Sequence, residues 1–508
     1  MRHPWILSIL GGFLYALSFP PFDFALPAWL ALVPLIVAAR TARSGRQAFL
    51  GGALAALVMC GFGFAWIADM AHRFWLVPWP VAGLLLLAYA TFGEINFTFF
   101  LFLAWRLRSR LERWPAAATA ALFAVVERVV PKVFPDALAH TQINVPGLPA
   151  AAALVGTTGL SFLVAWFAAC LAWLPAQQSV SLRRRLVELA LCLLAVAGMT
   201  AYGGQRFRHV DALEPARQLD ILIVQTNIGD PEILLRQYGN VSVVYDTIVA
   251  RYVDMTRRAL KDADADLVLW PETAIPGVPR GVSFEPARRL IQTFGTPFVL
   301  GGFDYQQPRP GVWRVYNTMF LLGPRGMIRD RYYKHKLLPL GEYVPFSDHF
   351  PVLLEWIPDA GDFSSGPGAR LFDIDGLRFA PFICYEILFP RYVRRGVRQG
   401  ADVLLNITND FWFGRYAEPE QHLKLARMRA FETARPIIRA TNTGFSALID
   451  ANGRVLRRTA LWQPEVLRGT LEVPPPQQTP YLRAGEWLTA TFLVLTLGLT
   501  ALIWKRVP

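Results

Sequence analysis

The chain has 508 residues, of which 54% are hydrophobic and 18% charged, and its formal net charge is +13. Soluble globular proteins average about 25% charged residues, so this composition excludes an ordinary soluble protein. The positive charge gathers beside apolar runs, and the chain contains no recognisable DNA- or RNA-binding motif. We therefore expect no nucleic-acid partner.

Eight apolar runs are candidates for membrane-crossing helices, each of which needs about 20 predominantly apolar residues. They cover residues 5–21, 25–40, 48–69, 77–105, 115–131, 150–174, 186–204 and 487–504. Pro27 and Pro34 interrupt the second run, and Glu127 and Arg128 interrupt the fifth. A cleaved signal peptide is the alternative for the first run, but no small-residue cleavage pattern follows it.

Basic residues beside these runs predict their orientation, because short loops rich in Lys and Arg stay in the cytoplasm. With eight spans and the N-terminus inside, the basic clusters fall on one side: Arg2; Arg40, Arg43 and Arg46; Arg106, Arg108, Arg110 and Arg113; Arg183, Arg184 and Arg185; Lys505 and Arg506. Arg73 and Lys132 are the main exceptions. The polar stretch after the seventh run is then expected on the outer face of the membrane.

Three parts follow: a transmembrane bundle of seven helices over residues 1–205, a polar domain over 208–483, and a last membrane helix over 486–508. In the polar domain, β-rich runs alternate with amphipathic helical patterns, which predicts an α/β fold. Strands are expected at 220–225, 267–270, 297–302, 319–322, 378–384, 403–407 and 437–440, and helices near 241–260, 285–294, 388–398 and 418–434. Residues 323–326 and 450–453 are predicted hairpin turns.

One cysteine, Cys384, lies in the polar domain, at the end of an apolar strand pattern. Acyl transfer through sulfur needs such a thiol, a group that takes and returns its proton, and donors where oxygen charge develops. Glu272 and Lys334 supply a carboxylate and a cation. Taken singly, each has a plainer explanation: a buried structural thiol, a turn-capping carboxylate and a solvated basic face.

Six short sequence motifs, taken together in their order along the chain, favour the catalytic interpretation over these plainer ones. They are Trp-Pro-Glu-Thr at Glu272, Tyr-x-Lys-x-x-Leu with Gly-Glu-Tyr-Val-Pro-Phe after Lys334, Gly-Asp-Phe-Ser-Ser-Gly at 361–366, Ile-Cys-Tyr-Glu at Cys384, Asn-Asp-x-Trp-Phe-Gly at 409–414 and Arg-Ala-x-Glu at 429–432. Together with Phe-Pro-Pro-Phe-Asp at 19–23 and Trp-Leu-Ala-Leu-Val-Pro at 29–34, they resemble the bacterial apolipoprotein N-acyltransferases. In that family a nitrilase-superfamily domain, an α-β-β-α sandwich, is carried on eight membrane helices.

This resemblance implies a two-step acyl transfer at the periplasmic face of the bacterial inner membrane, without metal or cofactor. Cys384 takes an acyl chain from a phospholipid, expected to be phosphatidylethanolamine, as a thioester. The α-amino group of the N-terminal diacylglyceryl-cysteine of an apolipoprotein then takes the chain. In this reading Glu272 is the general base and acid, and Lys334 favours the thiolate and the oxyanion.

The resemblance also suggests supporting residues. Glu342 is expected to position Lys334, and the backbone N–H of Tyr385 to help stabilise the oxyanion. Glu386 either orders the turn after Cys384 or pairs with an arginine. Asn409, Trp412 and Phe413 are expected to line an acyl pocket or a lid over it. The alternative is that they only pack in the core. One departure concerns the family's gating aromatic after the first strand, which is absent here; Tyr238 or nearby leucines are the candidate replacements.

Three further expectations concern the alternatives. Arg429 and Glu432 are expected to form a structural ion pair, and Glu94 an interhelical hydrogen bond within its span. A membrane-tethered carbon-nitrogen hydrolase is a second possible function, although a tether needs only one span. A lipid-binding or transport protein is a third, although binding alone does not need Glu272, Lys334 and Cys384 together.

Overall fold

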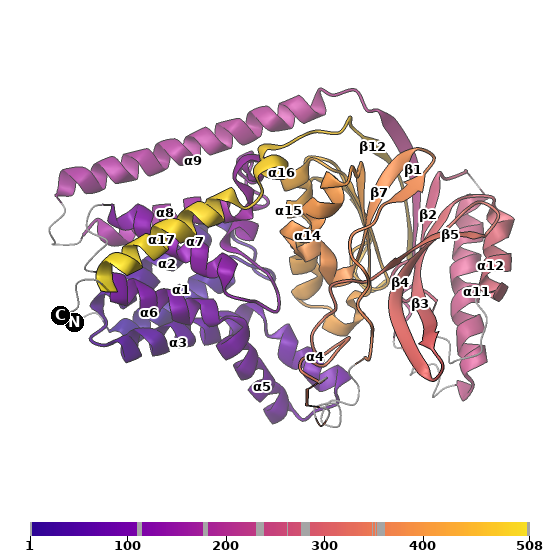
Figure 1. Ribbon diagram of the computed structural model, residues 1–508, viewed down its shortest axis with the longest axis horizontal. Helices are drawn as coiled ribbons and strands as arrows, with labels where there is room; N and C mark the ends of the chain where they lie inside the picture. The colour runs from indigo at the N-terminus through magenta and orange to yellow at the C-terminus, as the bar shows by residue number, and fades with distance from the viewer. Residues whose placement is uncertain are drawn as a thin grey trace. The chain divides into compact units, whose positions relative to one another are not determined.

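The computed structural model describes residues 3–108, 114–175, 181–229, 238–261, 263–275, 285–347, 349–350, 352 and 361–504. It divides into a helical unit and a two-sheet unit. The helical unit comprises residues 1–211, 416–432 and 478–508, and the two-sheet unit comprises residues 212–415 and 433–477. Figure 1 shows the chain coloured from one terminus to the other.

The helical unit consists mainly of apolar helices. Its elements are α1 (Pro4–Leu17), α2 (Ala25–Thr41), α3 (Gly45–Gly63), α4 (Trp66–Phe74), α5 (Trp79–Ala88), η1 (Tyr89–Gly93), α6 (Ile95–Leu107), α7 (Pro115–Val129), η2 (Leu138–Gln142), η3 (Leu148–Ala151), α8 (Ala152–Trp173), α9 (Leu182–Asp211), α15 (Glu418–Thr433), α16 (Pro480–Ala484) and α17 (Trp487–Trp504). Small residues allow several of these helices to pack closely, as at Gly12, where a Cβ atom would lie 2.4 Å from the carbonyl oxygen of Ala55.

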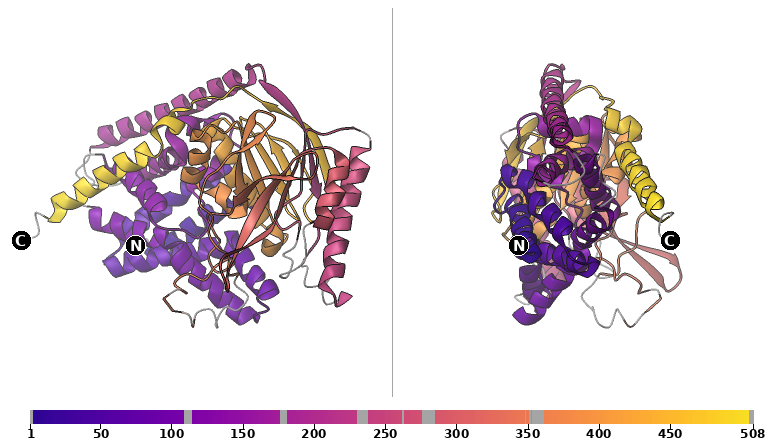
Figure 2. Two further views of the ribbon diagram at one scale, coloured as in Figure 1. Left: turned by 45° about the vertical axis from the view of Figure 1, so that its right-hand side comes forward. Right: turned by 90° about the vertical axis from the view of Figure 1, so that its left-hand side faces the viewer.

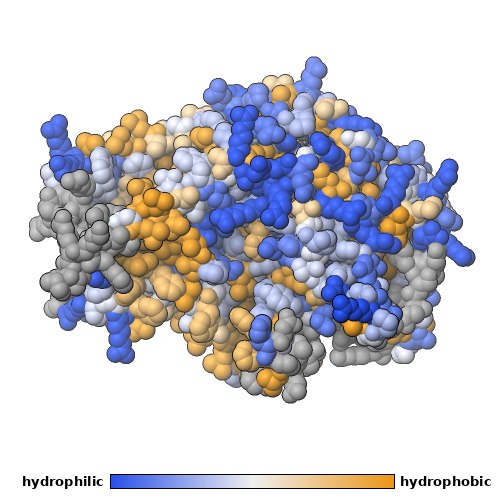
Figure 3. Space-filling model, viewed as in Figure 1, coloured by the Kyte–Doolittle hydropathy of each residue, from blue (hydrophilic) through white to orange (hydrophobic). Residues whose placement is uncertain are grey.

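Three of the described helices are long and apolar enough to cross a membrane: Gly45–Gly63, Leu148–Trp173 and Leu182–Asp211. A fourth span results if Trp79–Gly93 and Ile95–Leu107, which meet at a 44° bend, count as one. Three shorter apolar helices accompany them: Pro4–Leu17, Ala25–Thr41 and Trp487–Gly498. Several apolar helices are thus present, while a bundle of eight spans stays a prediction. Figure 3 shows hydrophobic side chains gathered over this unit.

Three arginines from the predicted cytoplasmic clusters bind the ends of neighbouring helices. Arg40, at the end of α2, donates to the carbonyl of Ala172 near the end of α8, over 2.7 Å. Arg108, after α6, donates to the carbonyls of Arg40 and Ala42. Arg185, in the first turn of α9, donates to Trp173 and Leu174. These arginines therefore gather at one end of the helical unit, where the carbonyl ends of the helices attract cations.

Glu94 has a structural partner, although this partner follows α7 instead of lying on a helix and the contact is an ion pair. It is fully buried between η1 and α6, and its carboxylate lies 2.9 Å from the ammonium of Lys132. Lys132 also pairs with Asp136, over 2.6 Å. The sequence did not identify this partner, because Lys132 follows α7 and no local pattern indicates that its segment folds back against Glu94.

The helix α15 lies between two strands of the sheet unit in sequence, yet it packs within the helical unit. Gln421 donates to the carbonyls of Pro20 and Gly63, and its oxygen accepts the indole N–H of Trp66. Lys424 forms an ion pair with Asp23 of the Phe-Pro-Pro-Phe-Asp word. The Phe-Pro-Pro-Phe-Asp segment therefore contacts α15 through Pro20 and Asp23.

The last turns of α15 are also buried. Arg429 and Glu432 form the expected ion pair, with 3.0 Å between Nη1 and Oε2. Glu432 also accepts the hydroxyl of Thr157, over 2.5 Å. Because both members of the pair are at most 1% exposed, removal of either one leaves a buried charge and destabilises the unit.

The two-sheet unit holds two mixed six-stranded sheets, ordered β12-β1-β2-β3-β4-β5 and β11-β10-β9-β8-β7-β6. The strands are β1 (Arg217–Gln225), β2 (Leu267–Leu269), β3 (Phe298–Arg309), β4 (Val312–Leu322), β5 (Ile328–Tyr333), β6 (Phe372–Ile374), β7 (Leu377–Ile383), β8 (Val403–Thr408), β9 (Ile437–Thr441), β10 (Ala447–Ile449), β11 (Val455–Arg458) and β12 (Glu465–Val473). Its helices are α11 (Val241–Leu260), α12 (Glu285–Ile291) with η4 (Gln292–Phe294), α14 (Pro390–Arg398), and the short η5 (Cys384–Leu388) and η6 (Asp410–Phe413).

The sheets stack face to face, with α11 and α12 on one outer face and α14 on the other (Figures 1 and 2). Apolar side chains of alternate positions on β1 to β4 pack against α11 and α12 around Trp270. Strands β1, β2 and β3 run parallel in one sheet, and β7, β8 and β9 in the other. This arrangement is the expected α-β-β-α sandwich, and it directs the carboxyl ends of β2, β7 and β8 toward one region.

Candidate active site

Glu272 lies three residues after β2 and is held by its backbone surroundings. A Cβ atom added at Gly301 of the neighbouring β3 would lie 2.5 Å from Glu272 Cα and 2.7 Å from the carbonyl oxygen of Pro271. Only glycine at this position lets the segment lie so close to the strand. The Glu272 side chain is 5% exposed, and its Oε2 accepts the backbone N–H of Asn409 over 2.8 Å.

Lys334 follows β5 and lies between two carboxylates. Its ammonium is 3.3 Å from Glu272 Oε1 and 2.9 Å from Glu342. Asn317, on β4, donates its side-chain amide to the same two carboxylates, over 2.7 and 2.8 Å. Glu342 also accepts the backbone N–H of Leu338. The structure therefore brings Glu272, Lys334 and Glu342 into one hydrogen-bonded cluster.

Burial and charge set the protonation of this cluster. Burial alone would lower the pKa of Lys334, but the carboxylates of Glu272 and Glu342 outweigh it and raise this pKa above the usual value. Burial raises the pKa of Glu272, against the opposing effect of the Lys334 charge. The lysine is thus a permanent cation at neutral pH, while the glutamate has a basicity suited to accepting a proton.

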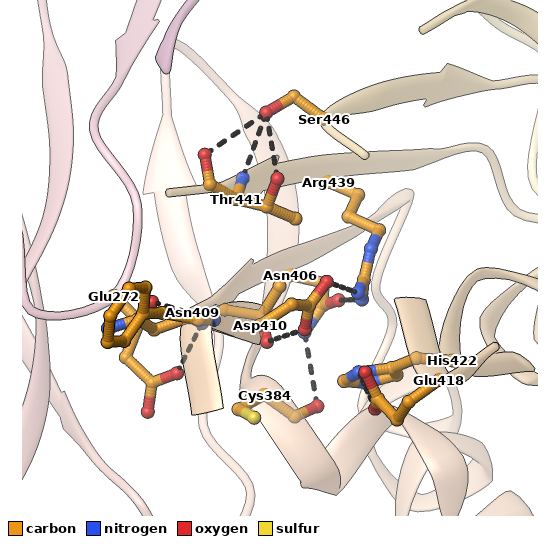
Figure 4. Close-up of polar contacts among 12 residues, drawn as sticks. Glu272, Cys384, Asn406, Asn409, Asp410, Glu418, His422, Arg439, Thr441 and Ser446 are labelled. Atoms are coloured by element: carbon orange, nitrogen blue, oxygen red, sulfur yellow. Dashed lines mark hydrogen bonds and ion pairs between the residues drawn. The ribbon is translucent and has the colours of Figure 1, made fainter. Parts of the chain in front are cut away.

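Cys384 occupies a sharp turn directly after β7. Its φ is +51°, in the left-handed region that a non-glycine residue seldom adopts. The side chain is 7% exposed. Burial, and after it the charge of Glu272, raise the pKa of the thiol well above the usual value, although Lys334 acts in the opposite direction. At neutral pH the sulfur therefore keeps its proton until a base removes it. Figure 4 shows the sulfur pointing to the side on which the Glu272 carboxylate lies.

A buried polar network supports the turn from the next strands. Asn406 of β8 donates to the carbonyls of Phe382 and Cys384, over 3.1 and 3.4 Å. Its side-chain oxygen accepts a guanidinium N–H of Arg439, which also pairs with Asp410 over 3.0 Å (Figure 4). Asn406, Asp410 and Arg439 are fully buried, so the network is rigid only while every charge keeps its partner.

Glu386 ties the turn to the segment that carries Lys334. It accepts the backbone N–H groups of Ile383, His335 and Lys336 over 2.7 to 2.9 Å, and the hydroxyl of Tyr332 over 2.7 Å. Burial raises the pKa of Glu386 to about 7, although these donors favour its ionised form. Of the two roles considered for Glu386, these contacts favour ordering of the turn over an arginine pair.

The remaining predicted residues lie around this core. Tyr385 is buried and packs edge-on against Phe389. Asn409 is buried, and its side chain donates to the hydroxyl of Thr273 over 2.9 Å, so it supports the Glu272 segment directly. Phe413 is 8% exposed, whereas Trp412 is 50% exposed. The residues considered for lipid gating lie mostly outside the described residues; Tyr238, at their edge, is 44% exposed.

Three residues at the site received no role from the sequence: Asn317, Asn406 and Arg439. Each is a polar residue inside an apolar strand, and each is at most 3% exposed. A buried Asn or Arg must find partners, so a polar residue inside an apolar strand was the available signal. The partners themselves lie 22 to 45 residues away in the chain, beyond any local pattern.

Comparison with known families gives two matches. Residues 233–481 match the carbon-nitrogen hydrolase family. Residues 11–170 match the apolipoprotein N-acyltransferase N-terminal domain. The first match contains the whole Glu272, Lys334 and Cys384 cluster, and the second covers most of the helices that precede it.

Curated proteins and solved structures give further likenesses. The apolipoprotein N-acyltransferase of Bdellovibrio bacteriovorus is 32% identical over 98% of this chain and 93% of its own length. The apolipoprotein N-acyltransferase of Azotobacter vinelandii is 33% identical over 99% of this chain and 95% of its own length. Among solved structures, Nit3 of Saccharomyces cerevisiae, a nitrilase-superfamily member, is 18% identical, with a TM-score of 0.38 over 56% of this chain and 95% of its own.

Proposed function

Because the chain belongs to the apolipoprotein N-acyltransferase family, we propose that Glu272, Lys334 and Cys384 carry out its acyl transfer. The chain is an N-acyltransferase of lipoprotein maturation, with lipid and lipoprotein substrates. The observation that supports the site most strongly is the single buried cluster in which Lys334 lies between Glu272 and Glu342. The remaining assignments follow from the chemistry that such a cluster allows.

In the first step the acyl chain moves from a phospholipid to sulfur. Glu272 takes the proton of the Cys384 thiol as the sulfur attacks the ester carbonyl. The carbon–sulfur bond forms, the carbon–oxygen bond breaks, and the lysophospholipid oxygen takes the proton back from Glu272. Lys334 and the backbone N–H of Tyr385 stabilise the oxyanion. Phosphatidylethanolamine is the proposed donor.

In the second step the α-amino group of the diacylglyceryl-cysteine attacks the thioester. The carbon–nitrogen bond forms and the carbon–sulfur bond breaks. The proton that nitrogen loses passes to Glu272 and then to the departing sulfur, which regenerates the thiol. Buried surroundings favour this exchange because they keep water away from the thioester. Trp412 and Phe413 are proposed to line the acyl pocket, with Asn409 holding the Glu272 segment beside it.

We also propose the membrane arrangement that the sequence predicts. Residues 1–205 and 486–508 provide eight spans, and residues 208–483 form the catalytic domain on the periplasmic side of the inner membrane. The described apolar helices support a multi-pass protein. The shared location of Arg40, Arg108 and Arg185 at one end of the helical unit supports a single cytoplasmic side.

The test is the intact mass of the purified protein after incubation with phosphatidylethanolamine. We expect an acyl-sized increase that hydroxylamine removes, that Cys384→Ala lacks and that Cys60→Ala, a buried cysteine of α3, retains. Addition of a diacylglyceryl peptide should then discharge the acyl chain onto the peptide. No mass increase in the wild-type protein, or an increase that Cys384→Ala keeps, contradicts the assignment.

A further inference from the structure

Asn317 contacts every charged residue of the cluster. Its Nδ2 lies 2.7 Å from Glu272 Oε1 and 2.8 Å from Glu342 Oε1, and its backbone carbonyl accepts the N–H of Lys334 over 2.9 Å. Ionised carboxylates only accept hydrogen bonds, so the amide nitrogen must face both of them. The orientation of the amide is therefore fixed, and Oδ1 is the atom that remains.

That oxygen has no hydrogen-bond partner among the described residues, although Asn317 is only 3% exposed. Buried side-chain acceptors are nearly always paired, and each exception calls for an explanation. A bound water can serve such an oxygen while the site is empty, and an entering substrate group can displace it; Oδ1 belongs to the same amide that binds the proposed base. A donor brought by a substrate fits both observations.

The two half-reactions differ in what they offer Oδ1. At the reacting centre of the first, the nucleophile is the Cys384 sulfur, and the phospholipid ester presents acceptor oxygens only. In the second, the nucleophile is an amine, which carries N–H donors. We propose that Asn317 binds the acceptor: Oδ1 accepts an N–H of the incoming α-amino group while Nδ2 holds Glu272 beside that nitrogen.

This inference rests on the proposed function, and its chemistry follows the second step given above. The amine forms the carbon–nitrogen bond, the carbon–sulfur bond breaks, and the amine proton reaches sulfur through Glu272. Asn317 takes up no proton. It orients one N–H, so that the nitrogen lone pair faces the thioester carbonyl, and it keeps the base within reach of another.

Two variants separate the oxygen from the nitrogen. Asn317→Asp keeps an acceptor oxygen and loses the donors to Glu272 and Glu342, whereas Asn317→Leu loses both at similar size. Acyl-enzyme formation with phosphatidylethanolamine and its discharge by a diacylglyceryl peptide are measured as separate single-turnover steps by intact mass. Thr318→Val is the control, because Thr318 is the next residue on β4 and, among the described residues, its hydroxyl bonds only the carbonyl of Tyr316.

We expect both Asn317 variants to form acyl-enzyme more slowly, because Glu272 loses a donor. The ratio of the discharge rate to the acyl-enzyme formation rate should fall about tenfold in Asn317→Leu, since one hydrogen bond contributes roughly this factor. The same ratio should stay unchanged in Asn317→Asp. The peptide concentration for half-maximal discharge should rise in Asn317→Leu. Asn317→Ala removes the same atoms without bulk, and it replaces the leucine variant if that protein does not fold.

If the ratio of discharge rate to formation rate is the same in Asn317→Asp and Asn317→Leu, the inference is overturned, since Oδ1 would then not bind the acceptor. A selective loss of acyl-enzyme formation with phosphatidylethanolamine, but not with phosphatidylglycerol, would also overturn it, because the donor headgroup ammonium would be the partner. If the wild-type protein forms no thioester, the proposed function itself fails, which is a different result from a thioester with unchanged ratios.

Discussion

Gly301→Ala tests how closely the Glu272 segment must approach β3. The new Cβ atom would lie 2.5 Å from Glu272 Cα, and relief to ordinary contact at 3.4 Å requires a shift of 0.9 Å, the difference between the two distances. The three nearest atoms belong to the backbone of Pro271, Glu272 and Thr273, so no side chain can rotate away. A misplacement of about 1 Å at a reacting group can cost about 10²-fold in rate, and overpacking costs about 1–3 kcal/mol of stability.

The assay is the rate of acyl-enzyme formation by intact mass, together with the thermal unfolding midpoint. Gly302→Ala is the matched control, because its Cβ would meet Ile275 and Phe320 at 3.3 to 3.5 Å, a tolerable contact on the same strand. We expect a loss of about 10²-fold in Gly301→Ala and little change in Gly302→Ala. Equal activities of the two variants would refute the claim that this approach positions the base.

Three further results are expected. Lys334→Met should abolish acyl-enzyme formation and lower the free energy of unfolding by about 3–5 kcal/mol, because the buried Glu272 and the partly buried Glu342 lose their cation; an unchanged thermal midpoint would contradict this. Glu386→Gln should lower both stability and the rate of acyl-enzyme formation, because one acceptor oxygen replaces two that serve four donors; wild-type behaviour in chemical denaturation and in the mass assay would show that the turn does not need them. Because Glu272 must be ionised to act as a base and burial raises its pKa, acyl-enzyme formation should fall as pH decreases, with a midpoint above the usual value of about 4.3; a rate constant that stays level down to pH 4 would exclude this role.

The longer buried strands of the sheet unit were predictable because they are continuous apolar runs, whereas the three-residue β10 is buried but was not predicted. The predictions at 403–407 and 437–440 lie within β8 and β9, and the predicted hairpin turns join β4 to β5 and β10 to β11. The strand β5 was missed because Arg329, Asp330 and Arg331 give it no apolar run. The strand β11 is exposed along most of its length, and such a strand is specified by its partner's register rather than by its own composition.

The site divides in the same way. Glu272 and Cys384 each follow a buried strand, and the topology brings the ends of these strands together. Short motifs at the strand ends were therefore enough to identify them as candidates. Asn317 and Arg439 could not be selected, because they act through pairings 25 to 45 residues apart in the chain. A polar residue inside an apolar strand has no identifiable partner until the register of the sheets is known.

Burial of the cluster bears on why a carbon-nitrogen hydrolase fold carries out transfer. Hydrolysis of a thioester needs a water molecule beside the base, whereas transfer needs that place for an amine. Glu272, Lys334 and Cys384 are each at most 7% exposed, and both carboxylates already share the amide of Asn317. In the proposed mechanism, an acceptor that reaches the sulfur meets Glu272 as a base with fixed geometry and little competing water. Selectivity for transfer over hydrolysis therefore depends on the packing that holds Glu272, which is the property that Gly301→Ala perturbs.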